Sequence, residues 1–266
     1  MLSVRDFFDL STCGFADLFP AEAPVWSALA GLKDYCVGRA GSLPGGGQLG
    51  DGVPLARHVV LHQGAVLEGS ELAIEHGDAT KGRLVVRYRG RHLEGATVLM
   101  AGAVLFGTSI DLGPGVLVEA GAYIREPAII GGQSEVRQGA YLRGFCLVGR
   151  RCVVGHATEM KHSIMLDDAK AGHFAYVGDS ILGRDCNLGA GTKLANLKFL
   201  RGEVSIRTPE GLVATGLGKL GAILGDRAQT GCNSVTNPGT LIGPEGMLLP
   251  NATAPSGWHP PHCVLR

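Results

Sequence analysis

Three basic residues recur at intervals of 18 positions in the middle of the chain: Arg125, Arg143 and Lys161. If the fold places them next to one another, their like charges repel and lower stability unless an anion offsets them. A bound phosphate would do so, since the arginine guanidinium offers paired donors to phosphate oxygens. The alternative is a solvated face that Glu126 or Glu159 partly neutralises. The spacing therefore raises the hypothesis of an anion site.

A histidine is the second candidate for chemistry. His173 lies in the segment Lys170-Ala-Gly-His-Phe-Ala-Tyr-Val-Gly-Asp. Acylation of an amine requires a free lone pair on nitrogen, and imidazole is the natural base for removing the proton near neutral pH. The alternative is a histidine accommodated in a turn. The residues alone leave both interpretations open.

A six-residue repeat must position these side chains. An apolar residue stands at every sixth position from Leu112 to Leu166, and a mostly small or short-branched residue precedes each by two positions, from Ile110 to Ile164. In a hexapeptide β-helix the large residue fills the interior and the small one fits a corner. Six residues turn an α-helix by about 600°, which spreads the apolar residues around it and excludes a helical interpretation. The sequence predicts an all-β, left-handed parallel β-helix. The repeat comprises Leu112, Val118, Ile124, Ile130, Val136, Leu142, Val148, Val154, Met160 and Leu166.

Stacking of successive coils follows from this repeat. Three hexapeptides make one triangular coil, so residues 18 apart stack at the strand spacing of about 4.8 Å. This rule predicts one column containing Arg125, Arg143 and Lys161. It also places Cys146 and Cys152 in the inward row of small residues, where buried cysteines are usually structural.

A zinc site is a competing hypothesis for the histidines His156, His162 and His173. A resemblance to the β-helical carbonic anhydrases would imply two histidines five residues apart and a third on a neighbouring chain. His156 and His162 are six apart, which moves one whole prism face, so their rings should point from different sides. We therefore predict no metal site.

The repeat also suggests the organisation of the chain. Its register slips by two residues between Leu166 and Leu182 and returns weakly from Leu224 to Leu248. Residues of about 197–222 are expected to form a hairpin arm projecting from the prism. Residues 55–104 carry a looser version of the repeat. We expect residues 1–50 to form a helical cap and linker that protects the open end, and residues 51–266 to form the β-helix domain.

Composition narrows the class of protein. The formal net charge of the 266 residues is zero, so no global field attracts nucleic acid or an anionic membrane. No uncharged apolar run approaches the roughly 20 residues of a membrane span, and the first residues lack the pattern of a signal peptide. Seven cysteines without a C-x-x-C pair suggest reduced thiols. We expect a cytoplasmic protein with neither a nucleic-acid nor a membrane partner.

The segment from Gly155-His-Ala-Thr-Glu-Met-Lys-His-Ser through the His173 string to Asn187-Leu-Gly-Ala-Gly-Thr and Asn196 resembles a known family. It is similar to the acetyltransferase half of the bifunctional N-acetylglucosamine-1-phosphate uridyltransferase / glucosamine-1-phosphate N-acetyltransferase. The resemblance is strong over about 140–196, weaker over 223–250 and absent from the N-terminal cap. The K-A-G-H-x-x-Y-x-G-D string is far more specific than a bare hexapeptide repeat.

The resemblance implies roles for individual residues. His173 would be the general base, and Asn196 would stand close to the reacting amine and thioester. The remaining implied contacts are Arg143 and Lys161 to the sugar phosphate, Tyr176 and Asn187 to the sugar, and Ala190 and Cys232 to acetyl-CoA. Cys232 falls where the family has a serine. The resemblance also implies a homotrimer with sites between neighbouring prisms, and a place in UDP-N-acetylglucosamine biosynthesis for the cell envelope.

The sequence departs from the family pattern in two places. The N-Y-D-G motif reads Asn196-Leu-Lys-Phe and loses its tyrosine, and the insertion that follows leaves Lys198 and Lys219 as candidates for a later phosphate-binding lysine. No Gly-rich, basic-tipped nucleotide loop opens the chain, so we do not predict uridylyl transfer. Whether a separate uridylyltransferase partner exists stays open.

The functional prediction is an N-acetyltransferase. It would move acetyl from acetyl-CoA to the amine of an amino-sugar phosphate, glucosamine 1-phosphate above all, without a metal. Two alternatives stay open. One is a hexapeptide acyltransferase with another donor, such as a longer acyl-CoA or an acyl carrier protein, or another acceptor, such as a nucleotide-linked amino sugar. The other is a non-catalytic β-helix that serves as a scaffold or regulatory subunit.

Overall fold

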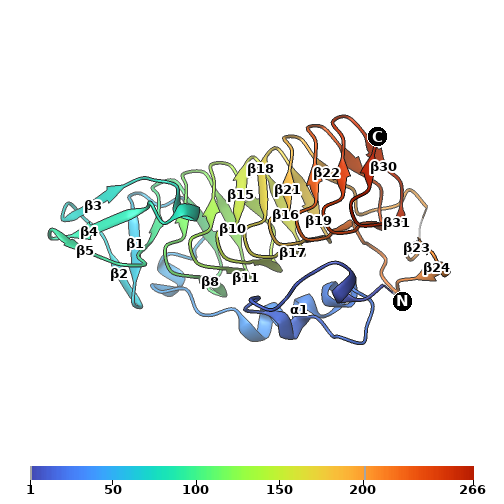
Figure 1. Ribbon diagram of the computed structural model, residues 1–266. Helices are drawn as coiled ribbons and strands as arrows, with labels where there is room; N and C mark the ends of the chain where they lie inside the picture. The colour runs from blue at the N-terminus through green and yellow to red at the C-terminus, as the bar shows by residue number, and fades with distance from the viewer. Residues whose placement is uncertain (1, 201) are drawn as a thin grey trace.

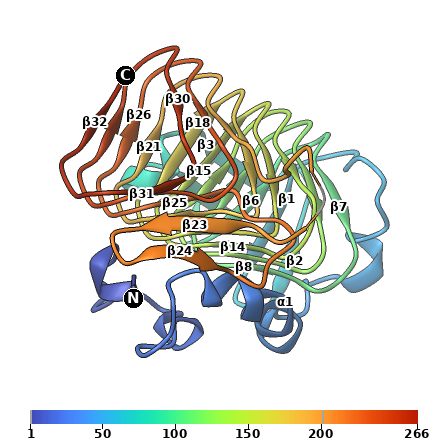
Figure 2. The same cartoon turned by 90° about the vertical axis from the view of Figure 1, so that its right-hand side faces the viewer.

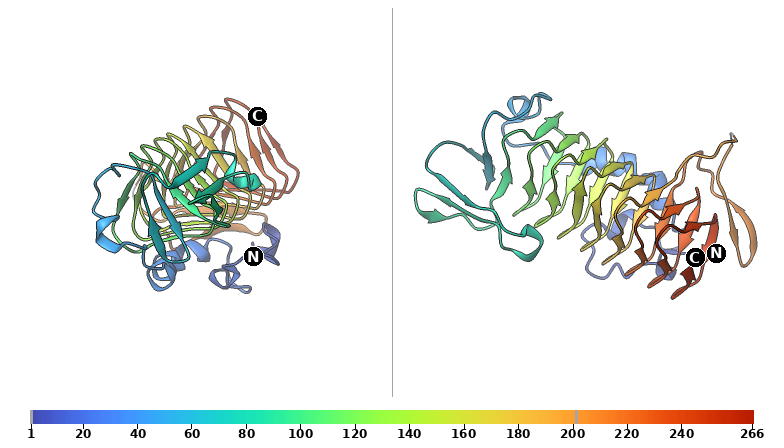
Figure 3. Two further views of the ribbon diagram at one scale, coloured as in Figure 1. Left: turned by 90° about the vertical axis from the view of Figure 1, so that its left-hand side faces the viewer. Right: turned by 90° about the horizontal axis from the view of Figure 1, so that it is seen from above.

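The chain winds into a triangular prism whose three faces are sheets of short, mostly parallel strands (Figures 1 and 3). The computed structural model describes residues 2–200 and 202–266. The predicted left-handed parallel β-helix is confirmed. Below, face 1 is the 11-stranded sheet, face 2 the 8-stranded sheet from β7 to β30, and face 3 the 8-stranded sheet from β8 to β31.

The strands of each face follow in the order in which they pair. Face 1 contains β2 (Ala65–Leu67), β1 (Val59–His62), β6 (Thr97–Leu99), β9 (Leu117–Val118), β12 (Glu135–Val136), β15 (Val153–His156), β18 (Lys170–His173), β21 (Asn187–Leu188), β26 (Gln229–Thr230), β29 (Met247–Leu248) and β32 (Val264–Leu265). Face 2 contains β30 (Thr253–Ala254), β27 (Val235–Thr236), β22 (Lys193–Leu194), β19 (Tyr176–Gly178), β16 (Glu159–Lys161), β13 (Tyr141–Leu142), β10 (Tyr123–Arg125) and β7 (Val104–Phe106). Face 3 contains β31 (Gly257–His259), β28 (Thr240–Ile242), β25 (Ala222–Leu224), β20 (Ile181–Leu182), β17 (Ser163–Met165), β14 (Cys146–Val148), β11 (Ala128–Ile130) and β8 (Ile110–Leu112).

The predicted apolar row fills the interior of the prism from Leu112 to Met160. Cys146 and Cys152 are fully buried in the accompanying row of small residues, as predicted. Large aliphatic and small side chains therefore alternate around each coil, which packs the interior without aromatic residues.

The prediction that Leu166 fills the interior was wrong. Met165, and not Leu166, occupies the interior position, because it pairs with Val148 before it and Leu182 after it, each 17 positions away. Leu166 instead packs outward in the cluster that contacts the N-terminal segment, as does Ile164. Two coils are each one residue short, and together they make up the two-residue slip.

Both shortenings fall at the same corner, between faces 2 and 3. There His162 and Asp179 take the left-handed backbone conformation, with φ of 46° and 47°. A tighter corner connects Met160 to Met165 and Val177 to Leu182 with five steps in place of six.

The N-terminal segment contains η1 (Val4–Asp6), η2 (Ala16–Leu18), α1 (Ser27–Arg39) and η3 (Gly46–Gln48). Its helix lies along face 3 (Figure 1), so the expectation that it covers the open end was wrong. The outer side of face 3 carries apolar residues that need cover, among them Leu147, Ile181 and Leu241. Only the linker, through Leu43 and Leu49, joins the interior cluster.

The looser repeat that we expected for residues 55–104 was also wrong over most of its length. β1 pairs antiparallel with β2 and with β6, and β3 (Leu72–Glu75), β4 (Val85–Tyr88) and β5 (Arg91–His92) form a separate antiparallel sheet. Gln63-Gly64 and Arg89-Gly90 both have positive φ at the tips of two-residue hairpins, the geometry that antiparallel neighbours prefer. η4 (Ala79–Lys81) lies between β3 and β4.

The insertion forms the predicted hairpin, with β23 (Ser205–Thr208) paired to β24 (Gly211–Ala214). It does not project freely. Val204 and Ile206 are buried in the same cluster as the N-terminal segment and Trp258, and Figure 2 shows β23 beside β31. The arm and the N-terminal segment therefore cover face 3 together. Among the described helices, none is long and apolar enough to cross a membrane.

Leu29 tests whether the helix stabilises the prism. Its side chain is 1% exposed in the cluster that covers face 3, so Leu29→Ala should lower the free energy of unfolding by about 2–5 kcal/mol. Val37→Ala is a matched control on the same helix, because Val37 is 66% exposed. Urea denaturation followed by circular dichroism measures both. Equal effects of the two substitutions would show that the helix does not depend on this contact.

Candidate active site

The predicted column of cations exists on face 2. Tyr123 pairs with Tyr141 and Tyr141 with Glu159, so Arg125, Arg143 and Lys161, two residues further on, occupy equivalent places on three successive coils. Arg125 ends β10 and Lys161 ends β16, while Arg143 directly follows β13. The 18-residue stacking rule is confirmed here.

The charge of this column is only partly compensated. Arg143 forms an ion pair of 2.6 Å with Glu159, whose hydrogen bond raises the pKa of the guanidinium. The suggested neutralisation by Glu159 is therefore correct. Glu126 instead accepts hydrogen bonds of 2.8 Å from the backbone amides of Thr108 and Ser109, so its carboxylate is committed elsewhere.

Asp179 is a central residue of the site that the sequence reasoning missed. It lies at the shortened corner, 7% exposed, where it accepts a hydrogen bond from Nδ1 of His162 at 2.8 Å and lies 3.6 Å from Nζ of Lys161. The amide of Asn196 also donates to it. Burial raises the pKa of Asp179, but the hydrogen bonds from His162 and Asn196 and the charge of Lys161 outweigh burial and hold it below its ordinary value of 3.8. One sequence feature could have identified Asp179: it is the final residue of the string that contains His173.

Asn196 and Tyr176 are held together beside Lys161. Asn196 is 8% exposed, and its Oδ1 accepts a hydrogen bond of 3.3 Å from the Tyr176 hydroxyl. Gly178 lies under the pair, and a Cβ there would lie 2.5 Å from the Tyr176 oxygen and 2.8 Å from the Asn196 amide nitrogen. Burial raises the pKa of the Tyr176 phenol. The phenol therefore stays neutral at physiological pH and can donate a hydrogen bond.

His173, Ala190 and Cys232 lie in one column at the corner between faces 1 and 2. The carbonyl of His173 accepts from Gly191 at 3.0 Å, that of Ala190 from Asn233 at 2.8 Å, and that of Cys232 from Asn251 at 2.9 Å. The His173 side chain is exposed. Tyr176 follows His173 by three positions in the chain, which limits their Cα separation to about 11 Å. The candidate base therefore borders the face that carries the cations.

Asn187 is the predicted residue that the chain does not bring to this cluster. It lies exposed on face 1, where it pairs with Lys170 of the preceding coil. The candidate lysines of the insertion differ in their surroundings. Lys198 donates to the carbonyl of Glu203 within the arm, while Lys219 precedes Leu220, whose amide binds the carbonyl of Asn196 at 3.2 Å.

Of the histidines considered for zinc, His162 lies apart from His156, as their six-residue spacing predicted, whereas His173 pairs with His156 on the neighbouring coil. Nδ1 of His156 lies 2.9 Å from the Gln138 carbonyl at the corner of faces 1 and 2, whereas His162 binds Asp179 at the opposite edge of face 2. Over residues 2–200 and 202–266, no group of three or more His, Cys, Asp or Glu side chains is arranged to hold a metal ion.

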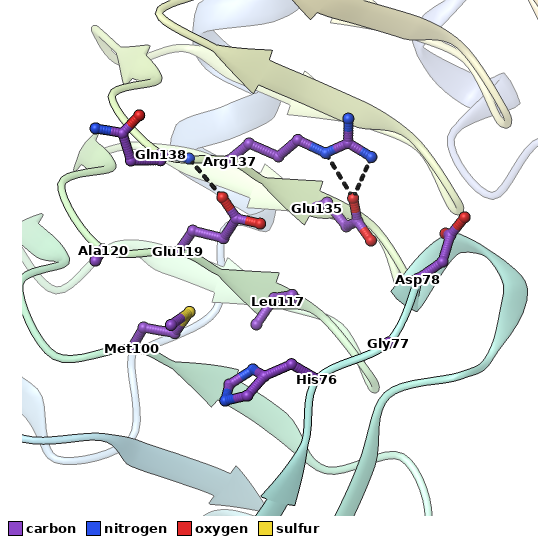
Figure 4. A pocket seen from close by; sticks show the side chains of 10 residues that line it. All are labelled: His76, Gly77, Asp78, Met100, Leu117, Glu119, Ala120, Glu135, Arg137 and Gln138. Carbon is purple, nitrogen blue, oxygen red and sulfur yellow. Dashed lines mark hydrogen bonds and ion pairs between the residues drawn. The ribbon is translucent and has the colours of Figure 1, made fainter.

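A cavity of about 690 Å³ lies elsewhere, between face 1 and the segment that connects β3 to β4 (Figure 4). One of its charged groups, Glu135, holds the segment between β3 and β4 to the prism. Glu135 is buried, accepts a hydrogen bond of 2.8 Å from the Ala79 amide and pairs with Arg137 at 2.7 Å. None of the predicted site residues lines this cavity.

Comparison with known proteins relates the middle of the chain to sugar-nucleotide enzymes. The family described as the GMPPB C-terminal domain matches residues 124–215. The bifunctional sugar-1-phosphate nucleotidylyltransferase/acetyltransferase of Sulfurisphaera tokodaii is 36% identical over 135 residues, which are 51% of this chain and 34% of the relative. The bifunctional protein GlmU of Methanococcus vannielii is 36% identical over 112 residues, 42% of this chain and 27% of the relative.

A shorter relative is the uncharacterized acetyltransferase YaiX of Escherichia coli, 36% identical over 97 residues, 36% of this chain and 42% of the relative. The matched part of the chain thus spans between about a quarter and two fifths of the length of these curated relatives. The resemblance to the acetyltransferase half of the bifunctional sugar-1-phosphate nucleotidyltransferase/acetyltransferases, predicted from the sequence, is confirmed.

Proposed function

We propose that the protein is an N-acetyltransferase that moves acetyl from acetyl-CoA to the amine of an amino-sugar phosphate, with glucosamine 1-phosphate as the simplest acceptor. One observation carries the proposal. Arg143 and Lys161 lie side by side on face 2, whose neighbouring corner presents the exposed imidazole of His173. The proposed phosphate-binding pair and the proposed base thus border the same face of the prism from its two edges.

The acceptor is held through its phosphate. Arg143 has further N–H donors besides the one that binds Glu159, and the Lys161 ammonium lies 3.6 Å from Asp179. Charge-assisted hydrogen bonds from both orient the phosphate. The Tyr176 hydroxyl then contacts the sugar, and the Asp179 carboxylate fixes the directions of Lys161 and Asn196 before the substrate arrives.

The transfer needs one base and no metal. His173 accepts a proton from the amine as nitrogen attacks the thioester carbonyl, forming the C–N bond and a tetrahedral oxyanion. Backbone amides of a neighbouring coil or the Asn196 amide stabilise this oxyanion. Its collapse breaks the C–S bond, and the CoA thiolate takes the proton from His173. The products are the N-acetylated sugar phosphate and free CoA.

The corner column supports our proposals for the donor site and for the assembly. Acetyl-CoA lies along the coils of Ala190 and Cys232, which continue the column of His173. Asn187 lies on face 1, so it can contact a sugar bound on face 2 only from a neighbouring prism. A homotrimer that sets face 1 of one copy beside face 2 of the next would complete each site.

His173→Ala tests the base. The substitution should lower kcat by roughly 10²–10⁴-fold, because water would then have to accept the proton from the amine. His156→Ala is the matched control, since His156 occupies the same position one coil earlier. Release of free CoA thiol from acetyl-CoA and glucosamine 1-phosphate measures both rates. An undiminished rate for His173→Ala, with transfer otherwise intact, would remove this imidazole from the mechanism.

Arg143→Ala tests the phosphate site. Loss of a charge-assisted contact worth about 1.5–3 kcal/mol should raise KM for glucosamine 1-phosphate by about 10- to 100-fold. KM for unphosphorylated glucosamine should stay unchanged. Arg91→Ala, at an exposed arginine on β5, is the control. If the phosphorylated and unphosphorylated acceptors lose affinity equally, Arg143 does not bind the phosphate.

Asp179→Asn tests the orienting carboxylate. Because the pKa of Asp179 is lowered from 3.8, its ion pairs contribute stability above that pH and are lost only as pH falls through the lowered pKa. The wild-type network is therefore intact near neutral pH. Asp179→Asn should raise KM and lower kcat there, each by about 10-fold.

Asp168→Asn is the matched control for this substitution. Asp168 also has a positive φ, of 65°, and pairs with Arg151 at 2.7 Å, at the corner between faces 3 and 1. A kinetic profile measured from about pH 6 to 8 compares the two variants. Unchanged constants in Asp179→Asn would contradict the orienting role.

A further inference from the structure

A second cavity continues the phosphate site toward the N-terminal coils. It has a volume of about 580 Å³ and contains Arg143, and its other lining residues include Arg125, Glu126, Phe106 and Phe145. The exposed Val37 of α1 contributes a wall from the N-terminal segment. A single phosphate would occupy only a small part of this volume, which lies within the range of small-molecule sites.

Arg125 is the cation of this cavity without a counter-charge. In the part of the chain that the structure describes, it makes no ion pair, and its guanidinium lies over the Phe106 ring at 5.5 Å from the centroid. The neighbouring Glu126 is committed to two backbone amides. Arg125 stands one coil from Arg143, at about the 4.8 Å strand spacing. A second phosphate next to the one bound by Arg143 would compensate it.

Aromatic side chains lie beyond this second cation. Phe106 is 42% exposed at the end of β7, and Phe145 turns into the cavity from a corner with φ of 51°. The Lys33 ammonium of α1 lies 5.7 Å from the centroid of the Phe145 ring. Phe145 is half-buried under this ammonium, so Phe106 is the exposed ring of the cavity. An exposed aromatic ring beside a cation offers a stacking surface to a planar heterocycle, with about 1–3 kcal/mol gained per stacked base.

We propose that this cavity binds the nucleoside diphosphate part of a nucleotide-linked amino sugar. The phosphate next to the sugar lies at Arg143 and Lys161, and the second phosphate lies at Arg125. The base stacks against the exposed ring of Phe106. This inference rests on the proposed function and names the acceptor class more closely, since a nucleotide-linked amino sugar is the same sugar phosphate carrying a nucleotide. It also gives the N-terminal helix a part in binding.

A comparison of acceptors tests the proposal. UDP-glucosamine and GDP-linked glucosamine should each be compared with glucosamine 1-phosphate in the thiol-release assay. At least one nucleotide-linked acceptor should have a KM lower by about 10-fold or more, the effect of one stacked base. A KM for glucosamine 1-phosphate equal to or below both would overturn the proposal.

Two substitutions locate the effect in this cavity. Phe106→Ala and Arg125→Ala should each bring the ratio of KM for glucosamine 1-phosphate to KM for the preferred nucleotide-linked acceptor toward one. Phe106→Tyr, which keeps the ring, should preserve this ratio. Arg91→Ala, on the distant sheet of β3–β5, is the control and should leave the ratio unchanged. A ratio that survives both alanine substitutions would place the nucleotide elsewhere and contradict the assignment.

Direct binding separates this inference from the proposed function. Calorimetric titration of the wild-type protein with UDP, GDP and inorganic phosphate needs no turnover. Binding of a nucleoside diphosphate that is lost in Arg125→Ala, in a protein that acetylates no amino sugar, would support the cavity and reject the transferase. Transfer to glucosamine 1-phosphate without binding of either diphosphate would reject the cavity alone.

Discussion

The parallel pairing of successive coils is the constraint on which the rest of the structure depends. Each outward side chain lies one strand spacing, about 4.8 Å, from its equivalents on the coils before and after. Face 2 therefore brings Arg125, Arg143 and Lys161 together although 18 residues separate each from the next. The resulting repulsion is partly offset by Glu159 and Asp179, and the uncompensated remainder is the physical basis for binding an anionic substrate.

The shortened corner gives the column a fixed end. Removal of one residue from each of two successive coils aligns Lys161 with Gly178 and brings His162 within 2.8 Å of Asp179. A buried carboxylate that binds three neighbours is stable only when those neighbours are present, so Asp179 holds Lys161 and Asn196 in defined positions. The absence of a side chain at Gly178 leaves room for Tyr176 and Asn196 above it.

The sequence predicted the features that follow from the repeat, because the coils up to Met160 share one period of 18 residues. The interior row to Met160 and the cation column are of this kind. Leu166 was misassigned because a one-residue deletion leaves an apolar residue at either register, and only pairing with Val148 selects Met165. The place of the N-terminal helix could not be predicted, since it depends on the outer side of face 3, and Asn187 would need a neighbouring chain to join the site.

A crystal structure of the protein with glucosamine 1-phosphate bound would test directly whether the cation column on face 2 binds the phosphate of the substrate. We expect phosphate oxygens within hydrogen-bonding distance, about 2.7–3.2 Å, of both Arg143 and Lys161, with the amine of the sugar directed toward His173 or its equivalent in a neighbouring copy. A phosphate held on another face of the prism, with Arg143 and Lys161 still occupied only by Glu159 and Asp179, would contradict this expectation.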